Sequence, residues 1–365
     1  MSGPTVDVVI AVHDSARPLR RAIDSVLDGA PSGVRVIVVR HGLPAESFGD
    51  LRDAYEASLV TWIDFADGVR SAAGPFTAGV QAATAEYVGL LGSDDRFEAG
   101  ALARMVGRVA TDRPDVLVYP MRYDDGPPLA NPLSRWRRER RLDPVRDRLA
   151  YRTAPLALFR RTLVDDLGLR FTPGVATGED AEFSARLWFA DVRIDFHPRD
   201  PGYVIMADAG TRVTMTARPF RQDLEAYRGL FDSDWIRGLG PRERHAFVVK
   251  TVRVHVLGAL LARASGEAFS ADDVAAAREL AQMGVQLAPR MLDPFSRADR
   301  AVLDVLLDES TGPDRIRAVG AERGRASRVA RWTPRAPWRI FDREGTLRRL
   351  VRYVTWPGRR QGTTT

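Results

Sequence analysis

Two adjacent acids, Asp94 and Asp95, follow an apolar run over residues 87–91 after a short Gly-Ser step. Such a run is typical of a strand buried on both faces of a parallel sheet, and the carboxyl ends of these strands face the crevice where open α/β sheets bind ligands. A carboxylate pair there suits Mg²⁺ or Mn²⁺ held against a diphosphate, because these ions take oxygen ligands and use few protein carboxylates. Taken alone, the pair is explained equally well as the cap of a following helix.

A second acidic pair, Glu179 and Asp180, follows Gly178 in the segment TGEDAEF (177–183). It lies in the first turn of a helix predicted over 178–190, where acids favour the positive end of the helix dipole. A carboxylate in this position is also able to take a proton from an attacking hydroxyl, which is the role of a general base. The residues themselves leave both explanations open.

Strands and helices are predicted to alternate over the first 120 residues. Runs of β-branched residues alternate with amphipathic or small-residue segments, which is the pattern of βαβ units in a mostly parallel sheet. Right-handed crossovers place the strand ends after Val12, Val39 and Leu91 along one edge, so the loops that follow them should share one crevice. The predicted strands cover 6–12, 34–40, 59–65, 86–91 and 115–120, and the predicted helices cover 16–30, 74–85 and 99–111.

The rest of the chain changes character twice. Residues 121–150 are polar and rich in Pro and Arg, which predicts a loop, and short strands and helices follow it. The apolar spacing then becomes helical to about residue 310, and 311–337 has the Arg, Gly, Pro and Ala content of a linker. We therefore expect a sheet domain over 1–215, a helical domain over 216–310, and a basic linker with an amphipathic tail over 311–365.

The order of these segments resembles the family 2 glycosyltransferases with a GT-A fold. The resemblance covers about residues 1–215 and rests on four segments: DVVIAVHDSARPLRRAIDSVL, VRVIVV, GPFTAGVQAATAEYVGLLGSDDRFEAGAL and GEDAEFSARL. It implies an α/β GT-A-type fold with a mostly parallel Rossmann-like sheet. It also implies inverting transfer of a sugar from a nucleotide diphosphate sugar to a hydroxyl acceptor, in the synthesis of cell-surface polysaccharide or glycolipid.

The resemblance assigns roles to particular residues. It makes Asp180 the catalytic base, with Glu179 beside it, and it places Mg²⁺ or Mn²⁺ on Asp95 or Asp94, the other of these two acids lying near the ribose. The region of Asp208 would close over the diphosphate, unless its charges form only a surface ion pair. The residues placed at the nucleotide sugar are Val12, His13, Asp14, Arg40, His41, Asp94 and Arg212, and those placed at the metal are Asp95, Asp94 and Asp208.

Three places depart from the family pattern. Arg40 and His41 stand where the family often has acids that read the base, Gly92 replaces the first acid of the metal cluster, and Phe76 and Thr77 replace an Arg-Asn pair. These departures leave the nucleotide open and keep a catalytically degenerate scaffold as an alternative. A nucleotidyltransferase would instead carry a Gly-rich basic loop after the first strand, which AVHDSARP matches poorly.

Composition excludes some chemistry and indicates where the protein is located. The chain has 365 residues, a net charge of +6 and no cysteine, which excludes disulfides and thiolate chemistry. The segment MSGPTVDVVIAV lacks the basic and apolar regions of a signal peptide, and we see no apolar run of the roughly 18 residues that a membrane span needs. We therefore expect a cytoplasmic protein.

Basic charge gathers over 135–148 and again beyond Arg315. The first run suits an acceptor that bears phosphate, such as a lipid or a polymer, although a solvated face explains it equally well. The tail segment 345–356 places apolar residues on one helical face beside arginines. This pattern suits peripheral contact with the inner face of the plasma membrane, or docking onto the protein's own surface. A basic nucleic-acid-binding protein is the other class, but no known motif supports a nucleic-acid partner.

Overall fold

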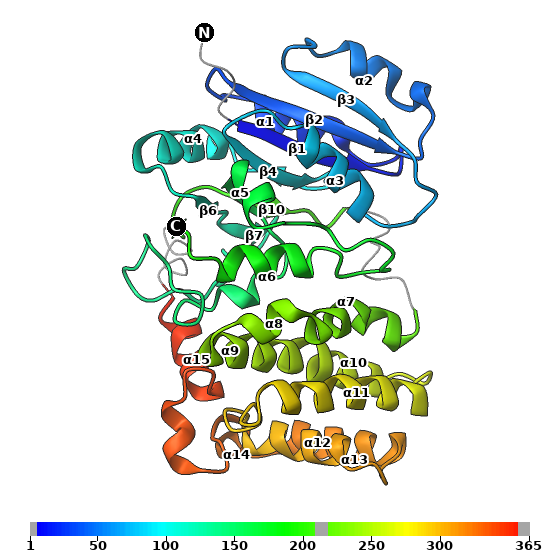
Figure 1. Ribbon diagram of the computed structural model, residues 1–365, viewed down its shortest axis with the longest axis vertical. Helices are drawn as coiled ribbons and strands as arrows, with labels where there is room; N and C mark the ends of the chain where they lie inside the picture. Colours follow the sequence, from blue (N-terminus) through cyan, green and yellow to red (C-terminus); the bar gives the residue numbers. More distant parts are fainter. Residues whose placement is uncertain (1–5, 209–217, 357–365) are drawn as a thin grey trace.

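The computed structural model describes residues 6–208 and 218–356 (Figure 1). Within them, the N-terminal part contains a seven-stranded sheet of order β3-β2-β1-β4-β8-β6-β9 and a three-stranded sheet of order β5-β10-β7. The strands of the large sheet are β1 (Val6–Val12), β2 (Val34–His41), β3 (Val60–Phe65), β4 (Tyr87–Gly92), β6 (Val116–Val118), β8 (Ala157–Arg160) and β9 (Ile194–Phe196). Those of the small sheet are β5 (Arg96–Phe97), β7 (Met121–Tyr123) and β10 (Tyr203–Ile205).

The large sheet is mostly parallel, as expected. β1 pairs in parallel with β2 and β4, and β2 pairs in parallel with β3, whereas β8 runs antiparallel to β4 and β6. The carboxyl ends of β1, β2 and β4 therefore lie along one edge. This arrangement brings the loops after Val12, His41 and Gly92 together, which is where the sequence predicts a ligand crevice.

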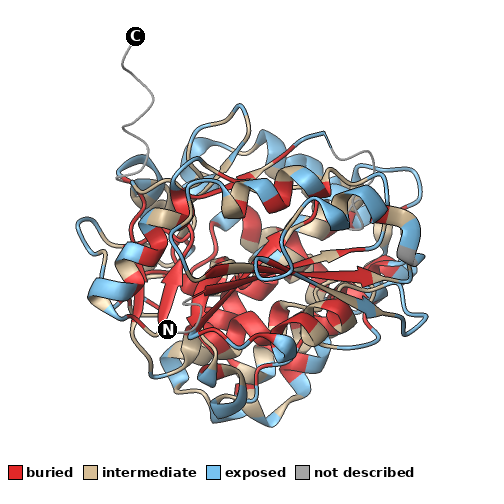
Figure 2. Cartoon of the chain, turned by 90° about the horizontal axis from the view of Figure 1, so that it is seen from above, coloured by how far each residue is buried: buried red, intermediate tan, exposed pale blue. Residues whose placement is uncertain are grey.

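Helices cover both faces of the sheet, and Figure 2 shows the strands buried between them. Gly79, on one of these helices, allows close packing, because a Cβ there would lie 2.3 Å from Val9 Cγ1. At the start of β1, the buried carboxylate of Asp7 accepts hydrogen bonds from Thr84 N and Ala85 N at 2.8 and 2.9 Å. The helices of this part are α1 (Leu19–Leu27), α2 (Gly49–Asp53), α3 (Ala73–Ala82), α4 (Ala101–Asp112), α5 (Thr162–Asp166) and α6 (Ala181–Phe189), with short 3₁₀ turns η1 (Ala45–Phe48) and η2 (Leu149–Tyr151).

The second half of the described chain is helical, as predicted, and it packs below the sheet domain in Figure 1 around its own apolar core. Its elements are α7 (Phe220–Asp232), α8 (Asp234–Gly238), α9 (Pro241–Thr251), the π-helical segment η4 (Val252–Gly258), α10 (Ala259–Ala264), α11 (Ala271–Leu287), α12 (Arg297–Leu307), α13 (Pro313–Arg325), α14 (Arg328–Trp332), the 3₁₀ turn η5 (Pro337–Phe341) and α15 (Thr346–Val354).

The expected linker over 311–337 is wrong for most of its length. α13 lies within this segment and buries Ile316 and Val319 in the helical core, where α13 contacts α10 and α12. The high Arg and Gly content of this segment hid two well-placed apolar residues on one helical face. The basic charge is therefore carried on the outside of a packed helix.

One helical segment, Pro241–Ala264, is long and apolar enough to cross a membrane by length and composition alone, which the sequence analysis did not anticipate. Of its most apolar stretch, 56% is buried inside the protein. Phe247, Val248 and Val252 from this segment are among the fully covered residues of the helical core. The segment therefore has the packing of a core helix.

The tail is tied to both halves of the protein. Glu344 is 2% exposed, its carboxylate accepts a hydrogen bond from Tyr151 Oη at 3.1 Å, and its backbone carbonyl accepts one from Arg253 Nη2 at 2.7 Å. Trp356, at the far end of α15, is buried in the core beneath the sheet. The tail thus docks onto the protein's own surface at both ends, while the outer face of α15 stays exposed at Val351 and Val354.

Candidate active site

Asp95 is fixed at the edge of the sheet by the neighbouring strand β10. Tyr203 Oη donates a hydrogen bond to Asp95 Oδ2 at 2.6 Å, and Met206 N donates one to Asp95 Oδ1 at 2.9 Å. Burial and the Asp95 carboxylate raise the pKa of Tyr203 well above its usual value, so this hydroxyl keeps its proton. The small sheet therefore holds Asp95, which follows β4, in one orientation.

Asp94 faces the beginning of α1. Its carboxylate forms an ion pair with Arg17, and its backbone carbonyl accepts a hydrogen bond from Arg21. Arg21 also binds the carboxylate of Asp208 with two hydrogen bonds, at 2.5 and 3.0 Å. Arg96, which is adjacent to the acid pair in sequence, instead pairs with Asp124 at 3.0 Å.

Arg17 and Arg21 are site residues that the sequence analysis missed. Both lie in the segment ARPLRRAI, directly after the first strand, so basic residues at a strand-to-helix turn were the available signal. Their guanidinium groups stand beside the two acids, where a diphosphate would need positive charge. Arginine suits this role because its planar fork binds phosphate oxygens in pairs.

Gly92 leaves a small space between the two carboxylates. A Cβ at this position would lie 3.0 Å from Asp95 Oδ2, 3.1 Å from Asp94 Oδ1 and 3.1 Å from Tyr203 Oη. The glycine that replaces an acid of the family pattern is thus required by the packing of the two acids that remain.

The donor set at Asp94 and Asp95 fits one hard divalent cation. The described residues contain no group of three or more His, Asp or Glu side chains arranged to hold a metal. Mg²⁺ does not require such a group, because one or two carboxylates plus phosphate oxygens are the usual ligands. Asp94 Oδ1 and Asp95 Oδ2 both border the position that a Cβ of Gly92 would take, so the two carboxylates lie side by side.

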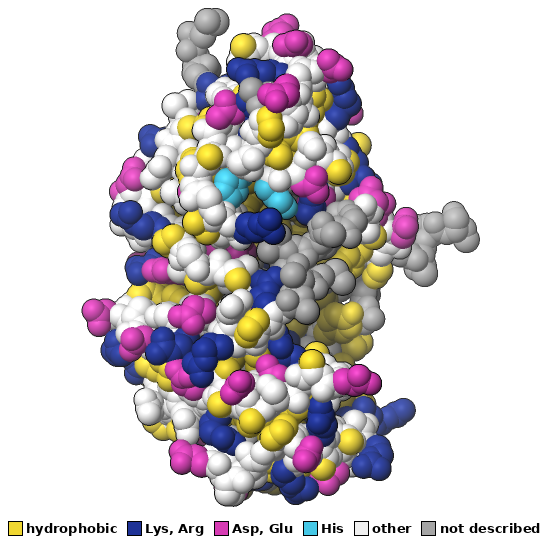
Figure 3. Space-filling model, turned by 90° about the vertical axis from the view of Figure 1, so that its right-hand side faces the viewer, with side chains coloured by type: hydrophobic (Ala, Val, Ile, Leu, Met, Phe, Trp, Pro, Cys, Tyr) yellow, Lys and Arg dark blue, Asp and Glu magenta, His cyan; other side chains and the backbone are white. Residues whose placement is uncertain are grey.

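The ends of β1 and β2 bring two histidines together. His13 has Arg17, Asp14, His41 and Asp94 as its charged or titratable neighbours, and partial burial followed by the charge of Arg17 lowers its pKa. Figure 3 shows histidine side chains at the surface of this face, with basic and acidic groups beside them. His41 Nε2 lies 2.8 Å from Asp67 Oδ1.

Two of the residues expected at the nucleotide lie behind this surface. Val12 is fully buried, and Arg40 is 2% exposed, with its guanidinium paired to Asp64 and within 3.3 Å of the Pro44 carbonyl oxygen. His13, Asp14 and His41 are at least partly exposed at the ends of β1 and β2. Arg212 lies outside the described residues.

The family's Arg-Asn pair is replaced by residues with structural contacts. Phe76 stacks on Phe171 with 5.6 Å between the ring centroids, and Thr77 Oγ1 donates to the Ala73 carbonyl oxygen at 2.7 Å. The Phe76 contact packs α3 against the segment before α6, and the Thr77 bond stays within α3. The departure therefore has a packing explanation, and it removes polar groups from this part of the site.

Asp180 and Glu179 stand immediately before α6, whereas the sequence predicted them in the first turn of this helix. Thr172 N donates to the Glu179 carbonyl oxygen at 2.8 Å, which fixes the turn. Burial, and then the charge of Glu179, raise the pKa of Asp180 to about 7. Burial also raises the pKa of Glu179, although Arg218 opposes this shift. A carboxyl group that titrates near neutrality is well matched to general-base catalysis.

Lys250 is the second group that sequence analysis missed. It is the only lysine of the chain and is 2% exposed on α9. Its Nζ lies 3.0 Å from His255 Nε2 and 5.1 Å from the centroid of the Tyr227 ring, which stacks on His255. Burial lowers the pKa of Lys250 to about 7, and the nearby charge of Asp180 opposes this shift.

Lys250 links the helical domain to the acid pair. Its ammonium charge lowers the pKa of Asp180, against the larger effect of burial. Burial and the charge of Lys250 lower the pKa of His255 well below its usual value, so this ring is neutral and its Nε2 accepts a hydrogen bond from Lys250. The one lysine among 54 basic residues was the available signal, but nothing in the sequence pairs it with Asp180.

Comparisons with solved structures show the same fold in TarS of S. aureus. The crystal structure of S. aureus TarS 1–349 in complex with UDP-GlcNAc superposes with a TM-score of 0.71 at 14% identity, covering 88% of this chain and 92% of that one. TarS 1–349 in complex with UDP gives a TM-score of 0.68 over the same shares. A longer TarS structure gives 0.67, and the match then covers 55% of that chain.

Sequence comparison gives a family match for the N-terminal part of the chain. No curated protein sequence matches the chain. Residues 7–168 match the family model described as Glycosyl transferase family 2, a range that includes Asp94 and Asp95 but ends before Asp180. The GT-A-type α/β fold with a C-terminal helical region is confirmed, and the N-terminal part of the chain is similar to family 2 glycosyltransferases over residues 7–168.

Proposed function

We propose that the protein transfers a sugar from a nucleotide diphosphate sugar to a hydroxyl acceptor, with inversion at the anomeric carbon. The observation that carries the proposal is a carboxyl group with a pKa near 7, Asp180, in a chain that is similar to family 2 glycosyltransferases over residues 7–168 and presents an acid pair at the end of β4. A UDP-sugar is the first donor to test, because TarS structures of the same fold hold UDP-GlcNAc and UDP.

The donor would lie along the edge formed by β1, β2 and β4. His13, Asp14 and His41 border the space for the nucleobase, and Arg17 and Arg21 supply positive charge for the diphosphate. Asp94 and Asp95 would hold Mg²⁺ or Mn²⁺, which when bound would neutralise the charge of the leaving diphosphate. Arg21 also binds Asp208 and so keeps its carboxylate near this edge. We propose that Asp208 assists in binding the metal.

Asp180 would accept the proton of the acceptor hydroxyl as that oxygen attacks the sugar. It performs this role only as the carboxylate, so turnover should rise as the pH increases through about 7. Glu179 keeps the pKa of Asp180 high, and Lys250 limits that rise. We propose a polymer or lipid of the cell surface as the acceptor class; the arginines at 135–148 support an acceptor that bears phosphate.

A thermal-shift screen tests the donor side. UDP-, GDP-, CDP- and dTDP-sugars would be compared with and without Mn²⁺ or Mg²⁺, on wild type and Asp95→Asn. A ligand at 100 times its dissociation constant adds about 2.7 kcal/mol of stability. We expect a metal-dependent shift with one nucleotide that Asp95→Asn abolishes. No shift with any donor, in folded protein, would favour the scaffold alternative.

Donor hydrolysis or transfer tests the base. Asp180→Asn should lower kcat by roughly 10²- to 10⁴-fold, the usual contribution of a general base, while the donor thermal shift remains. Glu182→Gln, two residues further on in α6, is the matched control, because Glu182 pairs with Arg186 on the same helix. Equal loss in both variants would argue against a base at Asp180.

A further inference from the structure

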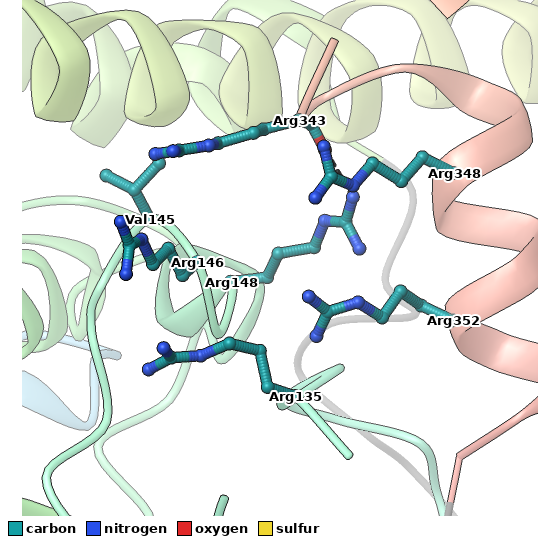
Figure 4. A pocket seen from close by; sticks show the side chains of 7 residues that line it. All are labelled: Arg135, Val145, Arg146, Arg148, Arg343, Arg348 and Arg352. Atoms are coloured by element: carbon teal, nitrogen blue, oxygen red, sulfur yellow. Dashed lines mark hydrogen bonds between the residues drawn. The ribbon is translucent and has the colours of Figure 1, made fainter. Parts of the chain in front are cut away.

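Six arginines converge on one cavity beneath α15. The cavity has a volume of about 240 Å³ and is lined by Arg135, Arg146, Arg148, Arg343, Arg348 and Arg352. Figure 4 shows their side chains arranged around a common space, with the first three on the loop before η2 and the others on the tail. The two basic runs that the sequence places about 200 residues apart are therefore one site.

Carboxylates balance only part of the charge of this cavity: Glu344 acts on Arg148 but also lies 3.7 Å from Arg253. Within the described residues, Arg135 is the one arginine of the six that forms an ion pair, with Asp147 at 2.7 Å. Elsewhere on the protein many arginines have an acid partner, as Arg108 has Asp200 at 2.9 Å and Arg193 has Asp195 at 2.7 Å. A cluster of like charges without counter-charge is unfavourable unless an anion is bound.

Arg148 shows the same deficit at the level of atoms. It is 4% exposed, and one of its amino groups donates to the Arg343 carbonyl oxygen. Its Nε and Nη1, and Nη1 of Arg343, are buried and find no hydrogen-bond partner among the described residues. Buried donors that lack an acceptor are costly, and the cavity that they border is the place where an acceptor would lie.

Electrostatics agree with this geometry. Burial lowers the pKa of Arg148 to about 10, against the opposing influence of Glu344 and Tyr151, and Arg349 and Arg352 add to the lowering. Burial and the neighbouring arginines 242, 146 and 348 also lower the pKa of Arg343. The charged forms of these side chains are therefore destabilised as they stand, and a bound anion would relieve the repulsion.

An apolar rim lies next to the arginines. A second hollow of about 300 Å³ shares Arg135, Arg348 and Arg352 with the first and is bordered by Trp136 and Val351. These two residues are 65% and 53% exposed. One surface thus combines a buried anion pocket with exposed apolar side chains, which matches a molecule with an anionic head and an apolar body.

We propose that this surface binds an anionic phospholipid of a membrane, with the lipid phosphate in the arginine cavity and Trp136, Val351 and Val354 against the acyl region. The site shares no residue with the donor side of the candidate active site, and the proposal does not require the transferase reaction. It places Arg135, Arg146 and Arg148, from the run offered above to a phosphate-bearing acceptor, at a lipid phosphate. In this proposal the exposed face of α15 contacts the lipid, while the buried residues on either side of the helix hold it on the protein.

Vesicle co-sedimentation without any donor sugar tests the proposal. The whole protein should bind vesicles that contain phosphatidylglycerol and should not bind pure phosphatidylcholine. The double variant Arg348→Gln/Arg352→Gln should lose roughly thirty-fold in binding, on the order of fivefold for each basic side chain near an anionic surface. The matched control is Arg221→Gln/Arg228→Gln on α7, which removes the same charge from a pair of arginines that bind Glu279. If both double variants lose vesicle binding equally, net charge alone explains the loss and the proposed site is wrong.

A second arm separates a lipid from a soluble phosphate compound. Val351→Ser/Val354→Ser should lose vesicle binding but keep the thermal shift caused by inorganic pyrophosphate, because the arginine cavity is unchanged. A pyrophosphate shift in wild type without any vesicle binding would overturn the lipid proposal and assign the cavity to a soluble phosphate ligand. No response to either probe would overturn it entirely. Neither result bears on the donor screen, so failure of this site and failure of the proposed transferase are distinguishable.

Discussion

At the scale of single residues, the candidate base is tuned by groups from two halves of the protein. Asp180 belongs to the turn before α6, and Lys250 belongs to α9 of the helical domain. Burial moves both groups toward their neutral forms, and each charge opposes that shift in the other. Lys250 is therefore a positioning residue that acts on the reaction through Asp180.

Replacing Lys250 by Met should move the pH dependence of turnover. The ammonium group favours the carboxylate of Asp180, so its loss should raise the pKa of Asp180 above about 7 and shift the acid limb of the kcat profile to higher pH. The profile is measured with saturating donor and acceptor, and Lys250→Arg, which keeps the charge, should retain the wild-type limb. If Lys250→Met lowers the maximal kcat while the acid limb of its pH profile stays in place, Lys250 has only a structural role.

At the scale of elements, the active edge depends on how closely β4 approaches β10. Gly92 is the last residue of β4, and the side chains of the two following acids and of Tyr203 crowd the position of its absent Cβ. Hydrogen bonds from Tyr203 and Met206 leave Asp95 little room to move. An added methyl group must therefore displace the acids themselves.

Gly92→Ala should lower the affinity for the donor. The loss of binding free energy should be at least as large as the loss in the free energy of unfolding. The contacts of 3.0 to 3.1 Å would force Asp94 and Asp95 apart, which disturbs the proposed metal and diphosphate ligands. Donor affinity is measured by titration and stability by thermal unfolding. The same change at Gly107, inside α4 with no atom within 4 Å of the new Cβ, should leave binding unchanged and add about 0.5–1 kcal/mol of stability. Unchanged donor affinity in Gly92→Ala would show that the acids are not the ligands.

Sequence reasoning reached the elements of the sheet domain because local patterns specify them. The β-branched runs before Val12, His41 and Gly92 are buried strands in the expected order, and the acids before α6 lie where a helix start was predicted. It failed where the meaning of a residue depends on distant contacts. Ile316 and Val319 bury a helix that looked like a linker, and Lys250 acquires its role from a residue 70 positions away, at Asp180. Arg17 and Arg21 were overlooked because a basic turn is usually only a solvated surface.

At the scale of the whole molecule, the tail joins the sheet domain to the helical domain. Glu344 receives a hydrogen bond from Tyr151 of η2, and its carboxylate lies 3.7 Å from Arg253 of η4. Arg148 also donates to the tail, through the Arg343 carbonyl oxygen. The buried carboxylate of Glu344 thus contacts both halves of the protein, through Tyr151 of the sheet domain and Arg253 of the helical domain.

Glu344→Ala should lower the free energy of unfolding by about 3–5 kcal/mol, because it leaves Arg253 buried without its carboxylate. Urea unfolding provides the measurement. Glu322→Ala on α13, which breaks an exposed pair with Arg315 at 3.7 Å, should change stability by less than about 0.5 kcal/mol. Similar small losses in both variants would mean that the tail adds little to the joined structure.

The single lysine also makes the protein its own reporter of opening. Amine-directed reagents have no other side chain to modify, and in the folded state Lys250 is covered by Tyr227 and His255. Its rate of acylation therefore measures how often the packing of Tyr227 and His255 over Lys250 opens. Donor or acceptor that closes the active edge should slow this one reaction, and peptide mass mapping would read out the change at one position without any engineered label.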